Sequence, residues 1–147
     1  MSSASDLQNG GDPLAGWGVR AVGAIADAVL IGVATYLIDL PARVPTRTGY
    51  LYLDVAVSFV YSFVLIAFWG RTFGMRWMRL EAVDAVEGHP RVGPAKAALR
   101  SLAAAVLTVV RVGAFLDLLW PLWDRHNQTL HDKVAGTVVL QHLRRVD

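Results

Sequence analysis

Asp27 interrupts an apolar segment that runs from Val19 to Ile38. The segment has about 20 residues, which is the length that a helix needs to cross a bilayer core of about 30 Å. A carboxylate inside such a helix is costly to insert, so it tends to face a polar partner or a cavity. Asp27 is therefore a candidate for binding a cation or relaying a proton.

Three arginines could adjust the charge around this carboxylate. Arg20 lies seven residues before Asp27, so two helical turns place both on nearly the same face, about 10 Å apart along the axis. Arg100 and Arg111 also share one face of a later apolar segment, and Arg111 is expected near the depth of Asp27. Ion and proton pathways use paired Asp and Arg residues, and so do purely structural helix bundles. Spacing alone leaves both interpretations open.

The C-terminal part of the chain carries a second polar motif. Thr129 and Asp132 have the spacing of a helix-capping pair. The β-branched run Thr137–Leu140 predicts a short strand that docks on the segment Arg76–Val83. Asp117, near the end of an apolar segment, is interpreted as a solvated or capping residue.

Three apolar segments predict the elements that must position these side chains. The first helix is expected over Trp17–Leu40 and the second over Tyr50–Trp69, with a loop containing proline and glycine over Pro41–Gly49. A third helix is expected from Pro94 to about Leu119. Pro121 then ends or kinks it.

The remaining segments complete the predicted fold. The stretch before Pro94 predicts a small surface hairpin, with one strand in Arg76–Asp84 and the other in His89–Val92. Residues 1–15 are expected to be a disordered N-terminal tail, residues 16–141 the transmembrane domain, and residues 142–147 a C-terminal tail. The predicted fold is an all-α membrane protein, a bundle of about three transmembrane helices with a small cytoplasmic β-hairpin and a short C-terminal tail.

The distribution of positive charge predicts the orientation. The loop after the second helix is rich in basic residues, whereas the loop after the first has only Arg43 and Arg47. The positive-inside rule then places the N-terminus and the second loop in the cytoplasm. A third helix that crosses fully would put the basic tail outside, against this rule, and a break near Arg111–Gly113 would return it. The length of Ser101–Leu119 favours the full crossing.

Composition excludes several other classes of protein. Of the 147 residues 54% are hydrophobic and only 18% are charged, below the value of about 25% that is usual for soluble domains. The chain has no cysteine, which excludes disulfides and zinc thiolates, and a net charge of +2 does not favour nucleic-acid binding. His126 and His131 lack the spacing of a metal pair. No convergent acid–base set is visible, so we expect neither an enzyme nor a metal or cofactor site.

The order of these motifs resembles the RDD family of bacterial membrane proteins, named for one arginine and two aspartates. Arg20 matches the arginine at the start of the first helix, and Asp27 matches the aspartate within it. Asp132, in the segment from Thr129 to Val139, matches the second aspartate, and Arg100 matches the arginine that opens the last helix. The loop from Arg71 to Asp84 also resembles the loop of the family. The resemblance covers about Ala15 to Leu140.

The resemblance implies a multi-pass protein of the bacterial cytoplasmic membrane, with a role in transport of a cation, a proton or an unidentified ligand. Asp27 would be the relay carboxylate, Arg20 and Arg111 would adjust its charge, and Asp132 would order the tail. The expected partners are the lipid bilayer and a homo-oligomer or larger membrane complex, without nucleic acid. The alternative is a non-catalytic accessory or scaffold subunit of a larger membrane assembly.

Overall fold

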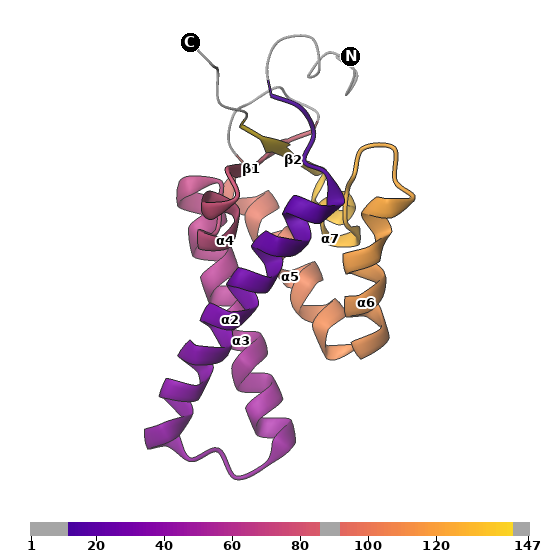
Figure 1. Cartoon of the computed structure of the whole chain (residues 1–147). Helices are drawn as coiled ribbons and strands as arrows, with labels where there is room; N and C mark the ends of the chain where they lie inside the picture. Colours follow the sequence, from indigo (N-terminus) through magenta and orange to yellow (C-terminus); the bar gives the residue numbers. More distant parts are fainter. Residues whose placement is uncertain (1–11, 86–91, 143–147) are drawn as a thin grey trace.

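Two long apolar helices form the axis of the molecule (Figure 1). The computed structural model describes residues 12–85 and 92–142. Helix α2 covers Trp17–Ala42 and helix α3 covers Arg47–Trp69. In the described part of the chain, these are the two helices long and apolar enough to cross a membrane, judged by length and composition.

The connection between these helices is shorter than predicted. Helix α2 continues through Pro41 to Ala42, and the left-handed Arg43 ends it with an N–H that donates to the Asp39 carbonyl. Helix α3 begins at Arg47 instead of Tyr50 because the Thr46 hydroxyl caps it, accepting from the Gly49 N–H at 3.0 Å. Proline in a last turn interferes with few helical hydrogen bonds, so it does not end the helix at Leu40.

The predicted third helix is broken in two. Helix α5 covers Pro94–Val109 and helix α6 covers Arg111–Leu119, with Val110 between them in an extended conformation at φ −87° and ψ 91°. Figure 1 shows α6 turning back beside α5 toward the end of the molecule that holds both termini. The expectation of one continuous helix is therefore wrong, the break lies next to the alternative position near Arg111–Gly113, and a count of three spanning helices is not confirmed.

Glycine allows this tight reversal. A Cβ atom added to Gly113 would lie 3.0 Å from the Leu107 carbonyl oxygen, so α6 approaches the backbone of α5 closely at this point. After α6 the chain forms the short 3₁₀ helix η1 (Trp120–Leu122) and then helix α7 (Leu130–Ala135). Helix α7 packs on α5, which brings the C-terminal segment next to the basic start of that helix.

A two-stranded antiparallel sheet closes the end of the bundle. Strand β1 (Leu80–Asp84) pairs with β2 (Thr137–Gln141), with Val83 opposite Val138. The predicted docking of the C-terminal strand on this segment is confirmed. The predicted partner strand His89–Val92 is not seen: Val92 is outside any strand, and residues 89–91 lie outside the described residues.

The start of the chain adds to this sheet. The Ala15 N–H donates to the Val139 carbonyl at 2.9 Å, Leu14 bridges Leu140, and Ala15 is fully buried. Residues 12–15 are thus part of the fold and not of a tail, whereas residues 1–11 lie outside the described part of the chain. At the other end His142, expected in the tail, contacts Asp12 and Glu81.

The packed core lies beneath the sheet and not between the long helices. Helix α4 (Phe73–Trp77), which the sequence did not predict, connects α3 to β1 and packs on α2. Large apolar side chains are exposed along most of α2 and at Tyr52, Val60, Phe68 and Trp69 of α3, as expected for helices surrounded by lipid. The buried cluster consists of Ala15, Ile66, Met75, Leu80, Ala82, Val92, Ala97 and Val139.

Candidate functional site

Asp27 joins three helices through neutral hydrogen-bond donors. The Tyr61 hydroxyl of α3 donates to Oδ1 at 2.5 Å, and the Gly74 N–H of α4 donates to the same oxygen at 2.7 Å. The Thr72 hydroxyl donates to Oδ2 at 2.5 Å. Both carboxylate oxygens are therefore bound, but by groups that do not compensate the negative charge. We call Asp27, Tyr61, Thr72 and Gly74 the Asp27 cluster.

The start of α4 holds this cluster in place. Thr72 is the N-cap residue of α4, and its oxygen accepts from the Met75 N–H at 3.2 Å while its hydroxyl donates to Asp27. Tyr61 likewise accepts from the Phe73 N–H at 3.1 Å. The first N–H groups of a helix lack partners within it, so Asp27, Tyr61 and Thr72 together satisfy three of them.

A glycine pair allows the close contact of α2 and α4. A Cβ atom on Gly74 would lie 2.1 Å from the Gly23 carbonyl oxygen and 2.8 Å from the Asp27 carboxyl carbon. No side chain fits at such distances, so position 74 requires glycine. The identity of Gly74 thus sets the distance at which α4 meets Asp27.

Gly74→Ala should separate α4 from α2 and destabilise the protein by about 1–3 kcal/mol, as overpacking does in well-packed sites. Gly32→Ala is the matched control, because a Cβ atom there meets nothing within 4 Å. That control should leave stability unchanged or raise it slightly, since alanine favours helix. Melting temperatures in a mild detergent compare the two. Equal melting temperatures would contradict the close α2–α4 contact.

A second polar cluster surrounds Asp132, whose side chain is fully buried. Arg20 of α2 and Arg100 of α5 both form ion pairs with its carboxylate, the latter at 2.9 Å. Asp132 also accepts from the Thr129 N–H at 3.2 Å, and the Thr129 hydroxyl accepts from the Asp132 N–H, so the predicted capping box is confirmed. One carboxylate therefore connects α2, α5 and α7.

Charge controls the ionisation of this buried carboxyl. Burial by itself would raise the pKa of Asp132, but the nearby charges of Arg100 and Arg20 hold that pKa far below its ordinary value. Asp132 is thus ionised throughout the physiological pH range, and its charge offsets that of the arginines.

His131 extends the cluster to α6. Its ring lies 3.2 Å from Arg100 Nη2 on one side and 2.6 Å from Asp117 Oδ2 on the other. The other oxygen of Asp117 accepts from the His131 N–H at 3.0 Å, at the first turn of α7. Asp117, expected as a solvated or capping residue, thus caps the first turn of α7 and is mostly buried, not solvated. We call Arg20, Arg100, Asp117, Thr129, His131 and Asp132 the Asp132 cluster.

The arrangement differs from the predicted Asp–Arg pairing. One of the two open interpretations tied Asp27 to an arginine of the third helix; of the arginines considered whose side chains are described, Arg20 and Arg100 both contact Asp132. The reason is the return of the chain after α5, which places α7 against α5 and α2. Arg111 begins α6, and its side chain lies outside the described residues.

The uncharged hydrogen-bond donors of Asp27 were not predicted from the sequence. Tyr61 was read only as part of an apolar helix, and Thr72 as part of a loop. The Thr-x-x-Met spacing before an apolar turn is the one local signal for Thr72, because threonine is a favoured N-cap residue. Within the described part of the chain there is no group of three or more His, Cys, Asp or Glu residues that could hold a metal ion.

Comparison with known proteins agrees with this description. Curated proteins and solved structures give no match to the chain. The model of the RDD family matches residues 14–136, which include both polar clusters and both long apolar helices. The match covers most of the chain, which therefore belongs to the RDD family of membrane-associated proteins.

Proposed function

We propose that this protein is a transport-related, multi-pass protein of the bacterial cytoplasmic membrane, in which Asp27 takes up and releases a proton or a monovalent cation. The observation that carries the proposal is that the described hydrogen-bond donors to Asp27 are all uncharged. Its hydrogen-bond partners among the described residues are two hydroxyls and one backbone N–H.

The arginines strengthen this argument. Of the three arginines that the sequence offered as counter-charges for Asp27, Arg20 and Arg100 are ion-paired with Asp132, and the side chain of Arg111 lies outside the described residues. A carboxylate in a helix that crosses lipid is costly unless its charge is compensated. Binding a proton or a cation supplies that compensation. The oxygens of Asp27, Tyr61 and Thr72 are also the hard ligands that such cations prefer.

The Asp132 cluster supports the proposal as a positioning device. Arg20 lies two turns before Asp27 on α2, so the ion pair with Asp132 fixes the end of the helix that carries the relay carboxylate. By the positive-inside rule, the basic residues around α4 support a cytoplasmic location for this end. Asp27 would then exchange its proton or cation with the cytoplasmic side.

Asp27→Asn tests this function. Asparagine keeps the Oδ1 acceptor for Tyr61 and Gly74, but its amide group cannot accept from Thr72 and carries no charge. In purified protein reconstituted into lipid vesicles with a pH-sensitive dye inside, a sodium or potassium gradient should drive proton flux. The variant should reduce that flux at least about tenfold, as expected for loss of an essential proton-transfer group.

Asp39→Asn is the matched control, because Asp39 is an aspartate of the same helix whose Oδ1 accepts from the Val44 N–H. Asparagine preserves that acceptor, so this variant should transport at the wild-type rate. Wild-type flux in Asp27→Asn, with normal size in gel filtration, would refute the role of Asp27.

A second candidate function is an accessory or scaffold subunit, without enzymatic activity, of a larger membrane complex. Small residues repeat every four positions on α2 at Ala24, Ala28 and Gly32, and a Cβ atom at Gly32 meets nothing within 4 Å. Such a surface allows close packing of a helix from another protein. Extraction in a mild detergent, sizing and identification of co-purifying chains separates the candidates: stoichiometric foreign subunits favour the scaffold, and a homo-oligomer favours transport.

A further inference from the structure

A second carboxylate lies within the spanning helices, away from both clusters. The Thr35 hydroxyl of α2 donates to Asp54 Oδ1 of α3 at 3.0 Å, and Thr35 is fully buried. We propose that Asp54 is a second proton-exchanging group, located nearer than Asp27 to the end of the helix pair that carries the α2–α3 connection. This inference rests on the proposed transport function and extends it to the other side of the membrane.

The positions along the helices place the two carboxylates at different levels. Asp54 precedes Tyr61 by seven residues, which is about 10 Å along α3, and Thr35 follows Asp27 by eight residues, which is about 12 Å along α2. Asp54 also lies about 10 Å from the start of α3 at Arg47. The two carboxylates thus lie at levels about 10–12 Å apart, with Asp54 nearer the α2–α3 connection.

The chemistry at Asp54 suits a proton better than a metal cation. Thr35 is its one hydrogen-bond partner among the described residues, and that bond leaves Oδ2 without a described donor. Alkali and alkaline-earth cations need several oxygen ligands, more than one hydroxyl and one carboxylate provide. A proton needs only the lone pair of Oδ2. The carboxylate would accept a proton there to become a neutral carboxylic acid, and would return that proton to water on the far side.

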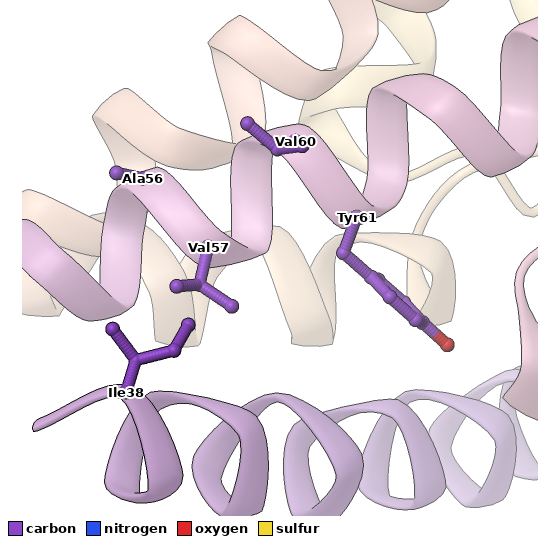
Figure 2. Close-up of a pocket in the computed structure, with 5 residues that line it drawn as sticks. All are labelled: Ile38, Ala56, Val57, Val60 and Tyr61. Carbon is purple, nitrogen blue, oxygen red and sulfur yellow. The ribbon is translucent and has the colours of Figure 1, made fainter. Parts of the chain in front are cut away.

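An apolar hollow of about 400 Å³ runs along the part of α3 that joins these levels. Figure 2 shows Ile38 of α2 and Val57 of α3 facing each other between the two helices, with the Tyr61 ring of α3 pointing toward α2. Val57 is one turn from Asp54, and the Tyr61 hydroxyl binds Asp27. The hollow therefore lies beside the stretch of helix between the two carboxylates, and neither carboxylate is among its lining residues.

Asp54→Asn removes the ionisable group and little else, because asparagine keeps the Oδ1 acceptor for Thr35. In the vesicle assay the proton flux of this variant should be at least about tenfold lower than that of the wild type. Asp54→Glu, which restores a carboxylate, should recover part of that flux. Ser58→Ala, one turn along α3, is the control and should transport at the wild-type rate.

The outcomes separate this inference from the proposed function. Wild-type flux in Asp54→Asn, with Asp27→Asn inactive, would overturn the role of Asp54 and leave that of Asp27 intact. If the wild-type protein gave no proton flux with either a sodium or a potassium gradient, the roles of both Asp27 and Asp54 would be overturned. Should the variant fold poorly, dicyclohexylcarbodiimide on the wild-type protein gives a second measurement. That reagent modifies protonated carboxyls in apolar surroundings, and mass spectrometry should find it on Asp54; an unmodified Asp54 would overturn the inference.

Discussion

Asp132→Asn should destabilise the protein by about 3–5 kcal/mol, because it leaves two buried guanidinium groups without their counter-charge. The wild-type carboxylate has no exposed surface, and the side chains of Arg20 and Arg100 are only 10% and 9% exposed. Water therefore cannot replace the missing charge. The expected result is a large loss of thermal stability in a mild detergent, or a failure to recover folded protein.

Two further variants show whether the effect comes from charge. Arg100→Gln should cost less than Asp132→Asn, because Arg20 still balances Asp132 after the substitution. Arg71→Gln is the matched control, since Arg71 pairs with Glu81 at 3.5 Å and its side chain is 36% exposed. Exposed pairs contribute about 1 kcal/mol or less. An Asp132→Asn variant as stable as Arg71→Gln would show that Asp132 does not hold the helices together.

The pH dependence of this difference follows from the lowered pKa of Asp132. A carboxyl whose folded pKa is lower than its unfolded pKa of about 3.9 stabilises the fold fully above that value. Its contribution decreases as the pH falls further toward the folded pKa. The stability difference between the wild type and Asp132→Asn should thus be constant from neutral pH to about pH 5 and shrink below pH 4. Melting temperatures of both proteins over this range measure it.

The sequence contained enough information for the two long apolar helices and the C-terminal strand. Apolar length located α2 and α3, and the β-branched run at Thr137–Leu140 predicted β2 together with its docking segment. Both signals are local, because each depends on residues that lie next to one another in the chain. The capping box of Thr129 and Asp132 was predicted for the same reason.

The pairing of charges could not be obtained in this way. Arg20 and Asp132 are separated by 112 positions, and their contact depends on the reversal at Val110. Val110 itself gives no signal for a break, and Arg111 and Gly113 beside it suggested a break only as an alternative to the full crossing. Predicting a continuous helix therefore directed attention to Arg111 and Asp27 as partners. The neutral partners of Asp27 were missed because α4 has only five residues, too few to show helical periodicity.

The chain that follows the α5–α6 pair should lie on the same side of the membrane as the loop that precedes α5. Helix α5 has 16 residues and helix α6 has nine, which correspond to about 24 Å and 14 Å, each shorter than a bilayer core of about 30 Å. The break is also compatible with an apolar environment. The Val110 N–H donates to the Val106 carbonyl, and the Val110 carbonyl accepts from the Ala114 N–H, both at 3.2 Å. Backbone groups at membrane depth must be paired in this manner.

Cysteine labelling measures this topology directly, because the chain has no cysteine and the wild type is a blank control. Single cysteines replace three exposed residues: Pro45 in the α2–α3 connection, Arg76 in α4, and Arg125 after η1. A membrane-impermeant maleimide on right-side-out vesicles should label the position-45 variant and leave the other two unlabelled until the membrane is opened. A third helix that crosses fully would instead make position 125 accessible together with position 45. In that case the ion pairs of Asp132 with Arg20 and Arg100 could not form, because the two ends would lie on opposite sides of the bilayer.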